Sequence, residues 1–317
     1  MASTEQAHAT GSVVTPGNHD GVHLGHRALV RAARQLADQQ QPALEVVALT
    51  FDPHPLHVMA PERAPPLLTS PERRAQLLLG AGADRVVVRP FDAAFASLTP
   101  EQFVAEVLRR DLGARAVVVG NDFRFGAQRA GDVARLRELM AETQGQVLTV
   151  PAVTLEGEVV SSSHVRAALA RGDVALAARM LTRVHDVTRT VIQGAQRGRT
   201  IGFPTANLEL SGLMTPADGV YAVVVRVLDE GPANPLRLGV ANLGVRPTVS
   251  AGRSLEVHLL DFAGDLYGKS LRVGFVARLR AEQKFESLDA LRAQIARDVE
   301  AGRGVLAQSD QLLWAWV

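Results

Sequence analysis

The chain has 317 residues, more than one hydrophobic core usually serves, so two domains are expected. Lys and Arg total 34 against 33 Asp and Glu, so the net charge gives no reason to expect nucleic acid or an anionic membrane as the main partner. The sequence has no cysteine, which excludes disulfides, thiolate nucleophiles and thiolate metal sites.

Strand and helix patterns alternate in the first half of the chain. Short β-branched runs that are apolar on both faces predict parallel strands covered by helices on both sides. These runs are Ser12–Thr15, Leu44–Phe51, Arg85–Val88, Ala114–Val119 and Gln146–Val150. The helical patterns between them are Leu24–Gln39, Pro71–Leu79, Pro100–Arg110 and Asp132–Glu142. This alternation predicts a doubly wound α/β sheet, which binds ligands at the carboxyl ends of its strands.

A helix over Asp173–Leu181 precedes a change of pattern near Arg183–Val184. Beyond it, strand-like runs alternate with connections rich in Gly, Pro, Asn and Asp, which predicts an antiparallel barrel or sandwich. The runs are Val187–Ile192, Val220–Leu228, Leu236–Leu243, Ser254–Asp261 and Ser270–Leu279. A long amphipathic helix, Leu288–Gly302, follows them. We therefore expect two domains, residues 1–183 and 184–317.

The segment Pro16–His26 (PGNHDGVHLGH) leaves the first predicted strand and enters the first predicted helix. Its three glycines, spaced four residues apart, let the backbone approach a ligand, and the helix N-terminus favours phosphate. His23 and His26 are three residues apart and share one face of the first turn. Two imidazoles aimed at a phosphate can donate hydrogen bonds to charge that develops in a transition state.

A zinc site is the main alternative for this segment, because His19, His23 and His26 give three imidazoles within eight residues. The sequence has no HExxH pattern, and the glycine spacing suits phosphate better than metal. A purely structural role ranks third. The local sequence therefore favours phosphate over zinc.

Three further segments fall where a doubly wound sheet places its ligand. Phe51–Pro55 (FDPHP) and Gly120–Gly126 (GNDFRFG) end predicted strands, and Ser161–Leu169 (SSSHVRAAL) opens a helix. The serines Ser161–Ser163 would also be explained by helix capping alone. Arg166, next to that capped helix start, suits a triphosphate clamp.

These four segments, in this order and spacing, resemble the nucleotidyltransferase module of prokaryotic bifunctional riboflavin kinase/FAD synthetases. The HxGH pattern alone is shared with a broad superfamily of adenylyl- and cytidylyltransferases, whereas GNxDGVHLGH with FDPHP and GxDFRFG is much narrower. The resemblance implies that His23 and His26 bind the ATP phosphates and stabilise the reacting centre. It implies further ATP contacts for Gly17, Asn18, Asp20, Gly25, Asp122, Ser162, Ser163 and Arg166.

The segment Gly194–Leu208 (GAQRGRTIGFPTANL) contains a basic turn flanked by glycines, followed by PTAN. Thr205 and Asn207 are two residues apart, so an extended backbone would point both side chains to one face. Hydroxyl and amide oxygens are hard ligands, suited to Mg²⁺ that bridges nucleotide phosphates. An ordinary turn at PTAN is the alternative.

Glu256 interrupts the apolar pattern of the predicted strand Ser254–Asp261. A carboxylate in a mostly apolar strand is costly unless it is paired or functional. Glu256 could act as general base for a substrate hydroxyl, and an exposed position on a half-buried strand fits the pattern equally well.

These segments, with Gly239–Val249 (GVANLGVRPTV) and Leu255–Leu271 (LEVHLLDFAGDLYGKSL), resemble the riboflavin kinase module of the same family. The resemblance thus covers nearly the whole chain and implies a six-stranded barrel with a C-terminal helix. It also implies FAD biosynthesis from small-molecule substrates. Riboflavin is phosphorylated to FMN with ATP, and AMP is then transferred from ATP to FMN, giving FAD and pyrophosphate.

The resemblance also implies roles for residues of the second domain. Thr205 and Asn207 would hold Mg²⁺ and phosphates, and Gly194 and Gly198 would contact ATP. Glu256 would activate the ribityl 5′-hydroxyl of riboflavin to attack the γ-phosphorus of ATP. No residue is assigned to the flavin from the sequence.

The chain departs from the family pattern beside the predicted phosphate site. Pro16 stands where the family has an aliphatic residue, His19 where it has Phe, and Ser163 where it has Thr. None of these changes removes a proposed catalytic group.

The N-terminal segment MASTEQAHAT lacks the basic start and apolar run of a signal peptide, and the apolar runs of the chain are strand-sized. We therefore expect a cytoplasmic protein with no membrane or nucleic-acid partner.

Overall fold

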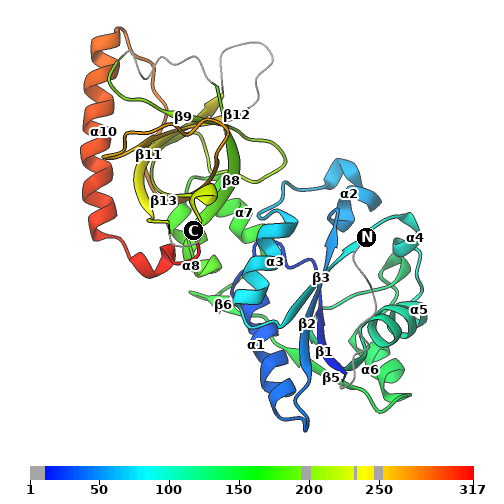
Figure 1. Cartoon of the computed structure of the whole chain (residues 1–317). Coiled ribbons are helices and arrows are strands. Elements are labelled where there is room, and N and C mark those ends of the chain that lie inside the picture. Colours follow the sequence, from blue (N-terminus) through cyan, green and yellow to red (C-terminus); the bar gives the residue numbers. More distant parts are fainter. Residues whose placement is uncertain (1–10, 194–200, 232–233, 246–252) are drawn as a thin grey trace. The chain divides into compact units, whose positions relative to one another are not determined.

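The computed structural model describes residues 11–193, 201–231, 234–245 and 253–317, and the chain divides after Ser161 into two units (Figure 1). The first unit is built on a parallel sheet with the strand order β3-β2-β1-β4-β5. Its strands are β1 (Ser12–Pro16), β2 (Glu45–Asp52), β3 (Arg85–Pro90), β4 (Ala114–Gly120) and β5 (Gln146–Val150). The predicted doubly wound sheet is confirmed.

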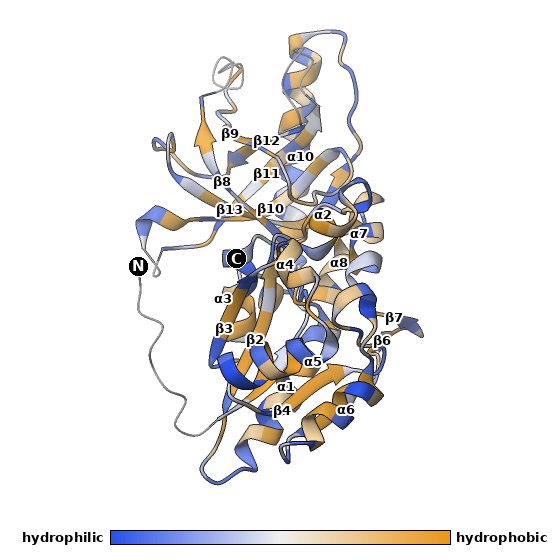
Figure 2. Ribbon diagram, turned by 90° about the vertical axis from the view of Figure 1, so that its right-hand side faces the viewer, coloured by the Kyte–Doolittle hydropathy of each residue, from blue (hydrophilic) through white to orange (hydrophobic). Residues whose placement is uncertain are grey.

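Burial along the strands follows their place in the sheet. The central strand β1 is buried along its whole length, and it pairs with β2 from Ser12 opposite Glu45 and with β4 from Ser12 opposite Ala114. Figure 2 shows the hydrophobic character of β2 and β4. The expectation that every strand is covered on both faces is wrong for the edge strands, because Val88 on β3 and Leu148 on β5 are exposed.

Helices cover both faces of this sheet, with α1 and α3 on one face and α5 and α6 on the other (Figure 1). The helices of the first unit are α1 (Leu24–Asp38), α2 (Pro55–Met59), α3 (Pro71–Gly80), α4 (Ala93–Ala96), α5 (Pro100–Gln102) and α6 (Val133–Ala141). Two of them begin at the predicted cap followed by proline. Ser70 accepts a hydrogen bond from Arg73 N, and Thr99 forms a capping box with Gln102. The predicted helix Pro100–Arg110 continues beyond α5 as a π-helix, Phe103–Asp111.

The second unit contains a closed barrel with the strand order β10-β11-β12-β9-β8-β13. Its strands are β8 (His185–Ile192), β9 (Ala206–Glu209), β10 (Gly219–Val227), β11 (Arg237–Val245), β12 (Arg253–Leu259) and β13 (Ser270–Arg280). Closure removes the exposed edges that an open sheet of this size would have. The six-stranded barrel is therefore confirmed. The short strand β9 and the hairpin of β6 (Thr154–Leu155) and β7 (Glu158–Val159) were not predicted.

The long helix α10 (Leu288–Gln308) packs on the outside of the barrel, as expected for its amphipathic pattern. Leu306 of this helix joins Trp314 and Val317 in a buried cluster with Ala222 and Val224 of β10. The C-terminal segment thus covers one strand of the barrel. Among the helices of the described ranges, none is long and apolar enough to cross a membrane.

Two helices, α7 (Ser162–Ala170) and α8 (Val174–Leu181), belong to the second unit. The Leu169 carbonyl accepts a hydrogen bond from Ala217 N at 2.9 Å, and α8 packs against β8 and β13. The spatial division therefore lies before α7, whereas the change of sequence pattern lies near Arg183. The functional boundary at residue 183 stays a prediction.

Candidate functional sites

The loop between β1 and α1 has an unusual backbone. His19 has φ 49°, Gly21 has φ 85° and Val22 has φ 44°. A β-branched residue such as Val22 rarely adopts this left-handed conformation, which costs about 1–3 kcal/mol and persists only where the surroundings enforce it. Residues 17–23, here called the phosphate loop, are therefore held in a conformation that the local sequence does not favour.

His23 caps the N-terminus of α1. Its Nδ1 accepts a hydrogen bond from Gly25 N at 3.1 Å, so a neutral His23 ring carries its proton on Nε2. The rings of His23 and His26 stack with centroids 3.7 Å apart. Burial, followed by repulsion from His23, His19 and Arg74, lowers the pKa of His26 well below 6.5. The two histidines are therefore brought together, and His26 is a neutral hydrogen-bond donor near pH 7.

His19 is fully buried, and its ring lies edge-on to that of His26 with centroids 5.1 Å apart. Its Nε2 donates to the Thr15 carbonyl at 3.1 Å, and burial lowers its pKa from 6.5 to about 4. A Cβ atom at Gly17 would lie 3.2 Å from this ring, so the missing side chain of Gly17 lets the loop pack closely on it. Within the described ranges, no group of three or more His, Cys, Asp or Glu has the geometry to hold a metal ion. The geometry thus gives no support to the zinc alternative.

The buried neutral His19 predicts a loss of stability in acid. Below pH 6.5 the unfolded chain binds a proton at His19, whereas the folded chain binds this proton only near pH 4. The free energy of unfolding therefore decreases as the pH is lowered from 6.5 to about 4. Between pH 7.5 and pH 5, the free energy of unfolding should decrease by about 2 kcal/mol less in His19→Phe than in wild type, because Phe binds no proton. Urea unfolding of both proteins at the two pH values measures this, and identical pH dependence would contradict the proposed burial of a neutral ring.

Asp20 is the buried acidic residue of the phosphate loop, with an exposed fraction of 1%. Its carboxylate accepts hydrogen bonds from Leu68 N at 2.9 Å, from Thr69 N at 3.0 Å and from Thr69 Oγ1 at 3.1 Å. This geometry favours a role in holding the loop. Contact of Asp20 with ATP stays a prediction.

Asn18 is half-buried at the start of the same loop. Its Nδ2 lies 3.2 Å from His54 Nε2, and His54 Nδ1 accepts a hydrogen bond from Leu56 N at 3.2 Å. The FDPHP segment thus meets the phosphate loop through His54, a residue to which the sequence analysis assigned no role.

A cavity of about 330 Å³ opens beside the loop, at the carboxyl ends of the strands. Gly17, Asn18 and Asp122 line it together with Arg124 and Arg129. Six of the chain's ten phenylalanines also line it: Phe51, Phe91, Phe95, Phe103, Phe123 and Phe125. Such an aromatic lining fits a flat aromatic ligand. Sequence reasoning missed this cavity, although its phenylalanines recur at the end of β2 and in the segments that follow β3 and β4.

Ser162, Ser163 and Arg166 lie in the first turns of α7, in the second unit. Their contact with a triphosphate stays a prediction. Gly25 lies in the first turn of α1, beside His23, where a Cβ atom would be 3.0 Å from the imidazole. Its lack of a side chain thus allows the capping geometry.

The barrel carries two cavities that share Thr205 in their walls. The first, of about 290 Å³, lies between the segment Pro204–Ala206 and the turn that contains Phe262 and Tyr267. The second, of about 380 Å³, is lined by Glu256, Asn242, His258, Arg280, Phe285 and Ile295. Thr205 therefore stands where groups bound in the two cavities would meet.

Glu256 on β12 lies opposite Asn207 on β9 and Asn242 on β11. Directly opposed residues of an antiparallel pair share one face, so these three polar side chains form a row across the strands. His258 Nδ1 donates to the Pro204 carbonyl at 2.8 Å and so ties the segment before Thr205 to β12. Gly194 and Gly198 lie outside the described residues.

Comparisons with known proteins match both units. The FAD synthetase family model matches residues 5–164, and the riboflavin kinase family model matches residues 181–306. The bifunctional riboflavin kinase/FMN adenylyltransferases of Escherichia coli K12 and Pseudomonas fluorescens are each 42% identical to this chain. The alignment with the E. coli enzyme covers 92% of each chain, and that with the P. fluorescens enzyme covers 94% of each. The Bacillus subtilis enzyme of the same name is 36% identical, over 90% of each chain.

A solved structure from Streptococcus pneumoniae, titled a macrolide-efflux protein, aligns with a TM-score of 0.82 and 32% identity. The alignment covers 93% of this chain and 95% of the solved chain, so both units have a counterpart in one solved structure. Together with the two family matches and the identities above, this length of agreement shows that the chain belongs to the family of bifunctional riboflavin kinase/FMN adenylyltransferases.

Proposed function

We propose that this protein makes FAD from riboflavin in two ATP-dependent steps, with riboflavin phosphorylated at the barrel and FMN adenylylated at the parallel sheet. The observation that carries the proposal is the presence, in one chain, of both family matches, each over a unit with its own cavities. We assign the adenylyl step to residues 1–183 and the kinase step to residues 184–317.

In the kinase step the ribityl 5′-hydroxyl of riboflavin attacks the γ-phosphorus of ATP, and ADP leaves. The Glu256 carboxylate takes the hydroxyl proton as general base, which is supported by its place in the wall of the larger barrel cavity. Phe285 and Ile295 in the same wall offer apolar surface to the flavin ring. The smaller cavity then takes the nucleotide, with its phosphates directed toward Thr205.

The oxygens of Thr205 and Asn207 fit Mg²⁺, because a hydroxyl and an amide are hard ligands and this ion completes its shell with water and phosphate. Bound there with ATP, Mg²⁺ would neutralise charge on the phosphates. The fit is supported by the position of Asn207, which lies opposite Glu256 and is buried.

In the adenylyl step an oxygen of the FMN phosphate attacks the α-phosphorus of ATP, and pyrophosphate leaves. His23 and His26 donate hydrogen bonds to the charge that develops on the α-phosphate, and no covalent enzyme intermediate is needed. The aromatic cavity beside the phosphate loop would take the isoalloxazine ring of FMN, with Asp122 in its wall. Ser162, Ser163 and Arg166 would contact the triphosphate.

The test is to incubate purified protein with riboflavin, ATP and Mg²⁺ and to separate the flavins over time. We expect riboflavin to fall, FMN to rise and then decline, and FAD to accumulate with two ATP consumed per FAD. Supplied FMN should yield FAD and pyrophosphate directly, and chelation of Mg²⁺ should stop both steps. A protein that leaves both riboflavin and FMN unchanged would refute the proposal.

A cytoplasmic location and the lack of nucleic-acid or membrane partners also belong to this proposal. The near-balance of charged residues and the small-molecule substrates support them.

A further inference from the structure

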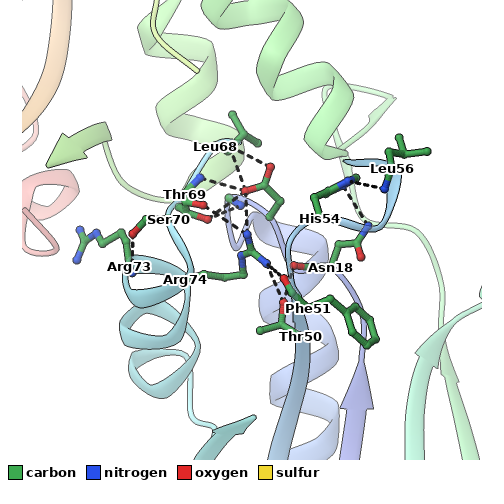
Figure 3. A network of polar contacts seen from close by, with 12 residues as sticks. Asn18, Thr50, Phe51, His54, Leu56, Leu68, Thr69, Ser70, Arg73 and Arg74 are labelled. Atoms are coloured by element: carbon green, nitrogen blue, oxygen red, sulfur yellow. Dashed lines mark hydrogen bonds and ion pairs between the residues drawn. The ribbon is translucent and has the colours of Figure 1, made fainter. Parts of the chain in front are cut away.

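The phosphate loop is held from the side of α3 by a network of buried polar contacts (Figure 3). The segment Leu68–Ser70, which leads into α3, donates three hydrogen bonds to the Asp20 carboxylate through Leu68 N, Thr69 N and Thr69 Oγ1. Thr69 Oγ1 also accepts a hydrogen bond from Gly21 N at 3.2 Å. These bonds hold Asp20 and Gly21, the two residues immediately before Val22, which has a positive φ that a β-branched residue rarely adopts.

Arg74 of α3 joins this network to the end of β2. Its Nη1 donates to Thr50 Oγ1 and to the Phe51 carbonyl, each at 3.0 Å. Its Nη2 donates to the Thr69 carbonyl at 3.4 Å and lies 3.9 Å from Asp20 Oδ1. Thr50 Oγ1 in turn donates to the Asn18 carbonyl at 2.8 Å, so Arg74 reaches the loop at two points.

The guanidinium of Arg74 is 1% exposed, and taking such a charge out of water is costly. A buried ion pair is often replaceable by apolar residues without loss of stability, so stability alone does not explain its presence. The terminal nitrogens of Arg74 contact four groups. Two of these belong to Thr50 and Phe51 at the end of β2, one to Thr69 before α3, and one to Asp20 in the loop. The charge is thus placed where it fixes the loop that carries His23 and leads into α1, which carries His26.

We propose that Arg74 is a positioning residue for adenylyl transfer, which holds the phosphate loop, through Asp20 and Thr50, in the conformation that aims His23 and His26 at the α-phosphate. This inference rests on the proposed function and adds a residue that no sequence motif singles out. The Arg74 side chain is 1% exposed and so is not open to a substrate, and its loss would act on the geometry of the reacting groups. A small displacement of such groups is enough to cost about 10²-fold in rate.

The experiment compares Arg74→Met, Arg74→Lys and Thr69→Val in the full chain, with both reactions measured. Arg74→Met should lower kcat for conversion of FMN to FAD by roughly 10²-fold and leave KM for FMN within about threefold. Arg74→Lys should recover part of kcat, because Lys keeps the charge near Asp20 but lacks the planar fork that serves Thr50 and Phe51 together. Thr69→Val, which keeps the shape and removes the Oγ1 contacts, should also lower kcat.

The riboflavin kinase rate of the same samples reports whether the chain is otherwise intact and should stay at the wild-type value. Arg85→Met is the matched control, because Arg85 pairs with Glu45 at 2.8 Å at the amino ends of β3 and β2, away from the loop. It should leave both rates unchanged.

Wild-type kcat in both Arg74→Met and Thr69→Val would overturn the inference, as would an equal loss in Arg85→Met. If Arg74→Met does not fold, Arg74→Lys and Thr69→Val decide, and full activity in both refutes the inference. Failure of wild type to make FAD would instead refute the proposed function, and this inference with it.

Discussion

Glu256→Gln is expected to lower the rate of FMN formation by about 10²–10⁴-fold, the usual effect of losing a general base. The substitution keeps the size of the side chain and its place opposite Asn207 and Asn242, and removes only the proton acceptor. Conversion of supplied FMN to FAD should stay near wild type, because the adenylyl step is assigned to residues 1–183 and Glu256 has no part in it. The measurement is the initial rate of each reaction on one preparation.

Glu209→Gln is the matched control for this change. Glu209 is an exposed carboxylate on β9, the strand that pairs with β12, and its partner there is Ser254. Its substitution should leave FMN formation unchanged. Full kinase activity in Glu256→Gln, or an equal loss in Glu209→Gln, would remove Glu256 from the proposed mechanism.

His23→Ala and His26→Ala should each lower FAD formation by about 10²–10³-fold, the cost of removing one donor to transition-state charge. His23→Ala also removes the acceptor for Gly25 N at the start of α1, so its effect should be the larger. Riboflavin phosphorylation should continue in both variants, and FMN should therefore accumulate. Separation of the flavins during turnover from riboflavin measures this directly.

His57→Ala serves as control, because His57 is an exposed histidine of the same unit and lies on α2. It should make FAD at the wild-type rate. The assignment of the phosphate loop fails if either His23→Ala or His26→Ala does so as well.

Much of the fold was predictable because burial and periodicity coincide in this chain. The central strands β1, β2 and β4 lie within one or two residues of their predicted bounds, since their apolar runs match their buried positions. The strand β9 was missed because it has four residues and begins inside the PTAN segment, which composition alone assigns to a turn. The edge strands were placed correctly, but their exposure depends on strand order, which no local pattern encodes.

The candidate sites were predictable only where chemistry is concentrated in short segments. His23 and His26 were predicted as a pair because they are three residues apart at a helix start, and the structure does bring their rings together. The aromatic cavity was missed because its phenylalanines come from separate segments that only the folded sheet brings together. Asp20 was predicted from the sequence to contact ATP, but its buried bonds to Leu68 and Thr69 depend on a segment almost 50 residues away.

The position of Thr205 between two cavities has a kinetic consequence. If the two cavities hold the nucleotide and the flavin as proposed, both substrates occupy the barrel together, and we expect phosphoryl transfer to proceed directly within a ternary complex. A ping-pong scheme, in which the enzyme itself is phosphorylated before the acceptor binds, needs no such arrangement. For the proposed kinase step we therefore expect sequential kinetics, in which neither ADP nor FMN leaves before both substrates have bound.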